Sequence, residues 1–149
     1  MTRLALAALH LVALGIGLGA VWARSRALRG DVQPADMRRA LTADTWWGVA
    51  AALWLATGLW RLFAGTEKPA GYYLSNHVFL LKMGLFVAVL ILEIGAMRTL
   101  TAWRRQLARG ETPPLDHAPR ISTVSAIEAA LVVAMVGAAV TMARGLGSH

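Results

Sequence analysis

Four long apolar runs dominate this sequence, at residues 4–23, 45–64, 78–98 and 121–143, and no run contains more than three formally charged side chains. A helix needs about 20 residues to cross the roughly 30 Å hydrocarbon core of a bilayer. Helices also satisfy their own backbone hydrogen bonds, which hydrocarbon requires of a spanning segment. The sequence therefore predicts an all-α fold, an integral membrane four-helix bundle. We expect one membrane domain over residues 1–149, with the lipid bilayer as its partner.

Composition narrows the chemistry that such a bundle can perform. The 149 residues include no cysteine, which excludes disulfides, thiolate metal sites, iron–sulfur clusters and covalently attached haem. A net charge of +7 would suggest nucleic acid as the partner of a soluble protein. In a membrane protein the same charge records which loops face the cytoplasm, so we expect no nucleic-acid partner.

Basic residues divide unequally between the two predicted sides. Ten lie at the first and third loops, namely Arg24, Arg26, Arg29, Arg38, Arg39, Arg98, Arg104, Arg105, Arg109 and Arg120. The opposite side has four, namely Arg3, Arg61, Lys68 and Arg144. This bias predicts a multi-pass protein of the bacterial inner membrane with both termini on the outer, periplasmic side. Residues 34–43 predict a short surface helix in the first loop, and the first run is too long for the apolar region of a signal peptide, so we expect it to be retained.

Aromatic residues gather near the predicted ends of the runs, where amphipathic rings settle at the membrane interface. We expect an inner belt of Trp22, Trp46, Trp47 and Trp103 and an outer belt of Trp60, Tyr72 and Tyr73. Trp54 differs because it lies in the middle of its run. It shares a helix face with Trp47 and Arg61 at seven-residue steps, and that face meets either lipid or a flat ligand.

Two ionisable side chains, His10 and Lys82, are predicted at similar depth toward the outer side, with His77 and Arg61 just above them. A charge in a spanning helix costs about 2.5–3.5 kcal/mol on insertion scales, so it usually faces the bundle interior. Neutral imidazole is a good ligand for haem iron, and a lysine amine can be one when burial keeps it deprotonated. The alternative is structural: His10 bonds a neighbour, and Lys82 reaches the nearby interface.

A second polar level is predicted nearer the cytoplasmic side. Glu93 and Glu128 lie at nearly the same depth, and Arg24, at the foot of the first run, is a candidate partner for either carboxylate. Lys82 and Glu93 are eleven residues apart, close to three turns, so they project from one face about 16 Å apart. These residues form either a proton path toward His10 and Lys82 or structural ion pairs that hold the bundle together.

Three sequence blocks are distinctive. They are Asp44-Thr45-Trp46-Trp47-Gly48, then Tyr72-Tyr73-Leu74-Ser75-Asn76 leading to Phe79 and Lys82, and the ending Met142-Ala143-Arg144-Gly145-Leu146-Gly147. Together they resemble the bacterial predicted-membrane family called domain of unknown function 2214. The resemblance covers essentially the whole chain, implies a membrane protein and carries no activity.

A more distant resemblance rests on His10 and Lys82. They match a histidine early in helix one and a lysine early in helix three of four-helix membrane proteins of the copper-resistance D type and of oxygen-independent protoporphyrinogen IX oxidases. Those oxidases are thought to bind b-type haem between the two residues. They carry a second histidine where this chain has Leu80, and an Arg-x-Asn-Glu-x-Pro motif where Arg120 is followed here by Ile121-Ser122-Thr123. The resemblance thus implies haem binding rather than porphyrinogen oxidation.

The leading functional hypothesis is a small membrane protein that binds b-type haem or a porphyrin in a redox role. His10 would be the axial iron ligand, and Lys82 the second ligand or a propionate partner. Trp54 would contact the ring, Arg61 would neutralise a propionate, and His77 offers a bis-histidine arrangement with His10.

Two alternatives remain from the residues alone: proton-coupled transport of a small solute or ion by an oligomer, and a non-catalytic accessory or assembly subunit. Whether the protein is an enzyme is left open. Gly15, Gly17 and Gly19 form a small-residue face that admits close helix contact, either within the bundle or in a homodimer.

Overall fold

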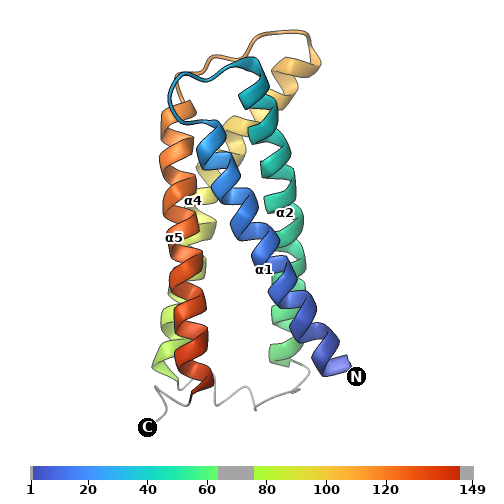
Figure 1. The fold of residues 1–149 in the computed structure, drawn as a ribbon, viewed down its shortest axis with the longest axis vertical. Coiled ribbons are helices and arrows are strands. Elements are labelled where there is room, and N and C mark those ends of the chain that lie inside the picture. The colour runs from blue at the N-terminus through green and yellow to red at the C-terminus, as the bar shows by residue number, and fades with distance from the viewer. Residues whose placement is uncertain (1, 64–75, 145–149) are drawn as a thin grey trace.

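Four helices make up the computed structural model, which describes residues 2–63 and 76–144 (Figure 1). They are α1 (Thr2–Ala27), α2 (Pro34–Phe63), α4 (His77–Ala108) and α5 (Ala118–Ala143). The described ranges contain no strand. The predicted all-α fold is therefore confirmed.

The helices run alongside one another and reverse direction at each connection (Figure 1). α1 packs extensively on α2 and also on α5, and α5 packs on α4, whereas α2 and α4 contact each other only slightly. The α1–α2 and α4–α5 connections lie at one end of the bundle, which we call the loop end. The start of α1 and the end of α5 both lie at the opposite end, on different sides of the bundle (Figure 1).

Three of the helices are long and apolar enough to cross a membrane: Leu4–Ala27 in α1, His77–Ala108 in α4 and Ala118–Met142 in α5. Most of their apolar side chains face outward rather than into the bundle. α2 is not among them, although it is long enough. Its indole rings, glycines and threonines make the helix less hydropathic than its neighbours.

Two helices extend further than the sequence predicts. The expected surface helix at 34–43 and the expected span at 45–64 form one continuous helix, α2, which starts at Pro34, a residue suited to a first turn. α4 continues ten residues beyond the predicted end at 98, because no helix breaker precedes Gly110. Gly110 has a positive φ of 76°, the conformation that favours glycine just past a helix end.

The interior contains two apolar clusters. The loop-end cluster consists of Leu28, Met37, Ala40, Leu41, Ala96, Leu100, Trp103, Ala118 and Ile121. The central cluster consists of Ala20, Val21, Trp47, Val89, Ala129 and Val132. The predicted inner belt is wrong for Trp103, which is 1% exposed and packs inside the loop-end cluster because α4 continues past the predicted membrane boundary.

The other tryptophans of the two predicted belts also include buried and exposed side chains. Trp47 is buried, and its ring edge lies 3.2 Å from where a Cβ on Gly17 would be, so the glycine lets α1 and α2 approach closely. Trp22, Trp46 and Trp60 are each more than half exposed, as expected of belt residues. Tyr72 and Tyr73 of the outer belt lie outside the described residues.

Candidate functional site

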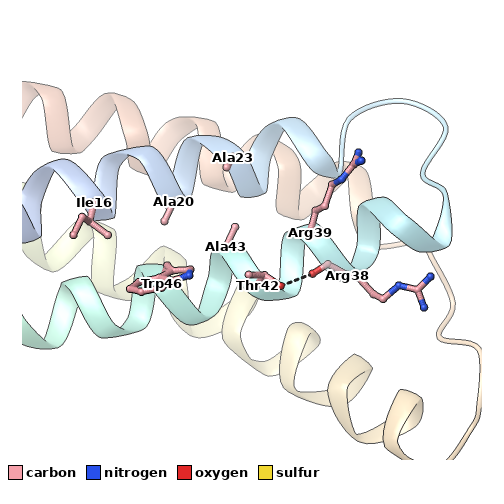
Figure 2. Close-up of a pocket in the computed structure, with 8 residues that line it drawn as sticks. All are labelled: Ile16, Ala20, Ala23, Arg38, Arg39, Thr42, Ala43 and Trp46. Atoms are coloured by element: carbon pink, nitrogen blue, oxygen red, sulfur yellow. Dashed lines mark hydrogen bonds between the residues drawn. The ribbon is translucent and has the colours of Figure 1, made fainter.

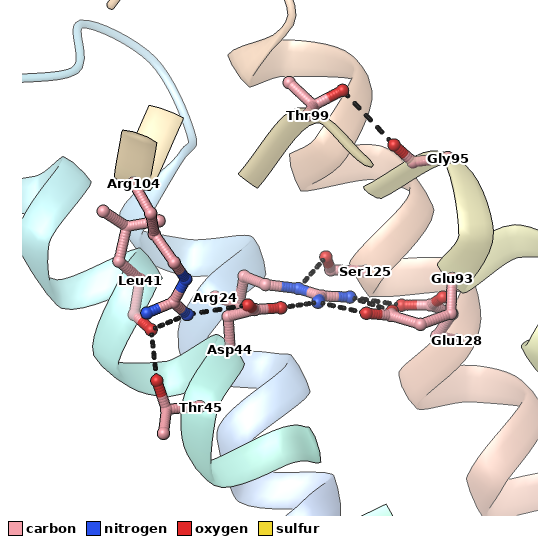
Figure 3. Close-up of polar contacts among 10 residues, drawn as sticks. All are labelled: Arg24, Leu41, Asp44, Thr45, Glu93, Gly95, Thr99, Arg104, Ser125 and Glu128. Carbon is pink, nitrogen blue, oxygen red and sulfur yellow. Dashed lines mark hydrogen bonds and ion pairs between the residues drawn. The ribbon is translucent and has the colours of Figure 1, made fainter. Parts of the chain in front are cut away.

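A buried arginine connects all four helices near the loop end (Figure 3). Arg24 of α1 is fully buried, and its Nη1 donates to Asp44 Oδ1 at 2.7 Å and to Glu93 Oε1 at 3.0 Å. Its Nη2 donates to Glu93 Oε2 and to Glu128 Oε2, both at 2.7 Å, and its Nε donates to Ser125 Oγ at 2.9 Å. A guanidinium has five N–H donors, so every donor of this buried side chain is satisfied.

A second arginine extends the group toward the loop end. Arg104 Nη2 donates to Asp44 Oδ2 at 2.8 Å and to the Leu41 carbonyl at 2.6 Å (Figure 3). Asp44 therefore bridges two guanidinium groups, one from α1 and one from α4. We call these six residues the Arg24 cluster: Arg24, Asp44, Glu93, Arg104, Ser125 and Glu128.

The Arg24 cluster has an uneven charge count. Its two guanidiniums face three carboxyl groups, so the cluster has one net negative charge when all three are ionised. Glu93 and Glu128 present their Oε2 atoms to the same nitrogen, and Glu128 Oε1 is buried with no hydrogen-bond partner in the described structure. Because burying a net charge is costly, one proton held by this carboxyl pair would balance the cluster.

The structure brings together the three residues that the sequence assigned to the inner polar level, Arg24, Glu93 and Glu128. Sequence reasoning missed Asp44 and Arg104 as members. Both lie where we expected solvated loop charges. The sequence signal that could have placed them is their spacing: Asp44 lies one turn before Trp47 on α2, and Arg104 lies three turns after Glu93 on α4.

The outer level forms a second group around one indole ring. Trp54 of α2 stacks on His10 of α1 with ring centroids 5.2 Å apart and an interplanar angle of 22°. The Lys82 Nζ of α4 lies 5.9 Å from the centre of the same ring, and Phe86 packs against it at 5.6 Å. The shared face of Trp47 and Trp54 is thus directed at other helices of the bundle.

His10 is oriented by Thr57 of α2. The Thr57 hydroxyl lies 2.8 Å from the Leu53 carbonyl, to which it donates, and 2.8 Å from His10 Nδ1. When the hydroxyl donates its one proton to the Leu53 carbonyl, it accepts from Nδ1–H, and in that tautomer the imidazole lone pair is on Nε2. Gly58 lies beside the ring, where a Cβ would be 3.4 Å from His10 Cε1. We call His10, Trp54, Thr57 and Lys82 the His10 layer.

Trp54 also has an unsatisfied donor. Its Nε1 is buried without a hydrogen-bond partner among the described residues. A buried indole N–H usually finds an acceptor, so this atom marks a position where an acceptor group could bind.

The remaining predicted ligand residues lie elsewhere. His77 is exposed at the first turn of α4, and the neighbouring Asn76 is buried and caps the helix by accepting from the backbone N–H groups of Val78 and Phe79. The Arg61 side chain is outside the described structure. Across residues 2–63 and 76–144, no three His, Asp or Glu side chains gather in a way that could hold a metal ion.

Apolar side chains separate the two polar groups. His10 and Arg24 are fourteen residues apart on α1, which corresponds to about 21 Å along the axis. The central cluster, including Val21, Trp47 and Val89, fills the space between them. The described part of the bundle thus contains two distinct polar levels, with a layer of apolar side chains between them.

The model of the family DUF2214, described as predicted membrane protein, matches residues 2–147. No curated protein and no solved structure matches the chain. The family match confirms the resemblance inferred from the three sequence blocks. Because it covers nearly every residue of a chain with three helices able to cross a membrane, the protein belongs to the DUF2214 family of predicted membrane proteins.

Proposed function

We propose that this protein is a multi-pass protein of the bacterial inner membrane that binds b-type haem or a porphyrin at the His10 layer, in a redox role. The observation that carries the proposal is the convergence of His10 and Lys82, from two different helices, on the Trp54 indole. This convergence lies in the half of the bundle away from the Arg-rich loops, among apolar side chains.

The proposed topology has α2 as a fourth crossing. Its 30 residues correspond to about 45 Å of helix, more than a hydrocarbon core requires. Its outward side chains in the outer half, Val49, Leu53, Leu55 and Leu59, are apolar and exposed, as expected of a surface that faces lipid. With both Arg-rich connections at the loop end, the positive-inside rule assigns that end to the cytoplasm and both termini to the periplasm.

The residues of the His10 layer fit the ligand in three respects. Thr57 Oγ1 lies 2.8 Å from His10 Nδ1, so it would accept from Nδ1–H in the tautomer whose Nε2 can ligate iron. Trp54 offers an aromatic surface and an unpartnered N–H. Lys82 places its Nζ 5.9 Å from the centre of the same ring, and in the proposed complex it would contact a propionate or, when deprotonated, the iron. Bound haem would supply one-electron chemistry, and the apolar surroundings would exclude water from it.

Absorption spectroscopy tests the proposal. Protein purified in detergent from haem-supplemented cells should show a Soret band, and His10→Ala should lose it. Thr57→Val keeps the shape of the side chain but removes the acceptor for Nδ1, so haem affinity should fall about 10- to 100-fold, as for other outer-shell partners of a ligating histidine. His117→Ala is the matched control, because His117 is an exposed histidine at the start of α5. A wild-type preparation that stays colourless after haem addition would exclude haem binding.

A non-catalytic accessory or assembly role is the second candidate, and the Arg24 cluster favours it. All five donors of Arg24 are satisfied by four other side chains on three helices, an arrangement suited to fixing helix register. Proton-coupled transport has less support, because the described helix segments between the Arg24 cluster and the His10 layer, residues 11–23, 45–56, 83–92 and 129–140, contain no charged side chain. If a His10→Ala variant loses the Soret band but still supports the protein's role in cells, the accessory role would be favoured.

A further inference from the structure

An apolar groove runs along the outer surface between α1 and α2 at the loop end (Figure 2). Its volume is about 520 Å³, within the roughly 300–1,000 Å³ range of small-molecule sites. α1 contributes Ile16, Ala20 and Ala23, and α2 contributes Arg38, Arg39, Thr42, Ala43 and Trp46. The three alanines leave the space, because a larger side chain at any of them would project into it.

The groove changes in polarity along its length. From Trp46 to Arg39, about 10 Å along α2, its lining passes from apolar side chains to two exposed arginines. Arg38 makes no ion pair with any described residue, and Arg39 shares only its Nη1 with Asp36, at 3.1 Å. The Thr42 hydroxyl donates to the Arg38 carbonyl at 3.0 Å, so the free donors at this end belong to the guanidinium groups.

The surroundings identify what would cover such a groove. α1 is a helix able to cross a membrane, so this outer surface faces acyl chains along the part lined by Ile16 and Ala20. Trp46, 55% exposed, marks the level where the hydrocarbon ends. The arginines follow at the depth of the phosphates on the side with the most basic residues.

We propose that the groove is a binding site for an anionic phospholipid. One acyl chain would lie along Ile16 and Ala20, the glycerol part of the lipid would lie beside Ala23 and Ala43, and the phosphate would accept hydrogen bonds from Arg38 and Arg39. The apolar part of the groove matches an acyl chain, and its cationic end matches a phosphate head group. Basic sites between helices on the cytoplasmic side are known to bind anionic head groups. The site is independent of the His10 layer, which lies at the other end of the bundle.

Native mass spectrometry of the full-length protein in detergent tests the site, with phosphatidylglycerol as the anionic probe and phosphatidylcholine as the zwitterionic one. We expect preferential retention of phosphatidylglycerol. Replacing both groove arginines, Arg38→Gln with Arg39→Gln, should lower that retention on the order of tenfold, because each juxtamembrane cation contributes separately. The matched control is Arg26→Gln with Arg29→Gln, which removes the same charge from exposed positions that do not line the groove.

The apolar half is tested separately. Ala23→Phe should fill the groove and reduce retention, whereas Ala8→Phe, at another exposed position of α1, should not. Excess glycerol phosphate should fail to displace the lipid. The proposal is overturned if both lipids are retained equally, if the two double-glutamine variants lose lipid equally, if Ala23→Phe binds normally, or if glycerol phosphate competes, which would indicate a simple anion site.

Discussion

At the scale of single residues, the structure is organised by one guanidinium group. Arg24 could be tolerated in an apolar bundle only because five N–H donors meet five oxygen atoms. The sequence predicted two of its partners, Glu93 and Glu128, because carboxylates inside apolar runs need a cation at the same depth. The prediction missed Asp44, because a charge beyond an apolar run has the same composition whether it is solvated or contacts a neighbouring helix.

Replacing Arg24 should therefore be costly. Arg24→Ala leaves three carboxyl groups without their shared cation, and breaking a buried ion pair from one side costs about 3–5 kcal/mol. Thermal unfolding in detergent should show a large drop in midpoint. Arg26→Ala, at an exposed position two residues away, should change stability by no more than about 0.5 kcal/mol. Equal effects of the two substitutions would contradict the ion-pair interpretation.

The carboxyl groups of the Arg24 cluster should not be equivalent. Glu128→Gln replaces one carboxyl group of the pair that would share the balancing proton with a neutral amide, so we expect a stability loss of no more than about 1 kcal/mol. Asp44→Asn breaks contacts with both Arg24 and Arg104 and should cost at least about twice as much. Denaturation midpoints of the two variants, measured side by side, check this order. The reverse order would mean that the cluster does not hold the proton inferred from its charge count.

At the scale of helices, close approach of α1 and α2 depends on a small residue opposite a large one. Gly17 lies against the ring of Trp47, while Gly15 and Gly19 face open space. The sequence identified this small-residue face but left open whether it packs within the bundle or in a homodimer. Within the chain, the structure assigns Gly17 to the bundle, and the homodimer stays a prediction for the exposed pair.

Gly17→Leu should push α1 away from α2. Overpacking of a close contact typically costs about 1–3 kcal/mol, so the unfolding midpoint should fall. Gly15→Leu provides the control on the same helix, because a Cβ added there would meet no atom within 4 Å. Equal unfolding midpoints for the two variants would mean that the Trp47 ring can move without cost, and that the Gly17–Trp47 contact does not contribute to stability.

Helix boundaries were the part of each element that the sequence predicted least well. Apolar composition ends where the membrane ends, but a helix ends where its backbone is stopped. α4 continues through polar residues to Ala108, and α2 begins eleven residues before its apolar run. Trp103 was misplaced for this reason: composition suggested an interfacial ring, whereas the helix extension carries it into the loop-end cluster.

At the scale of the whole molecule, the number of crossings decides the topology. The hydropathy of the described helices identifies three candidate crossings, and the length of α2 together with its extensive packing along α1 supports the proposed fourth crossing. The sequence predicted the order of the four long helices in the described residues, because each must satisfy its own backbone in lipid, but it separated residues 34–43 from α2. It could not predict which pairs pack, since lipid-facing and helix-facing surfaces here are equally apolar.

Cysteine labelling in intact cells distinguishes three crossings from four. The chain has no native cysteine, so single substitutions report cleanly. If α2 crosses, His77→Cys and Arg144→Cys should react with an impermeant maleimide, whereas Asp31→Cys and Glu111→Cys should react only after permeabilisation. His77→Cys labelling together with Asp31→Cys on one side would show that α2 does not cross.

The slight contact between α2 and α4 gives one side of the bundle a different mechanical character. There, Trp54 contacts Phe86 and Lys82 through side chains, and the backbones of α2 and α4 approach each other at only a few residues. Side chains change rotamer far faster than packed helices separate. A hydrophobic molecule dissolved in the bilayer could therefore reach the His10 imidazole laterally, between α2 and α4. Rotamer changes of a few aromatic side chains would be enough, without passage through water or separation of the helices.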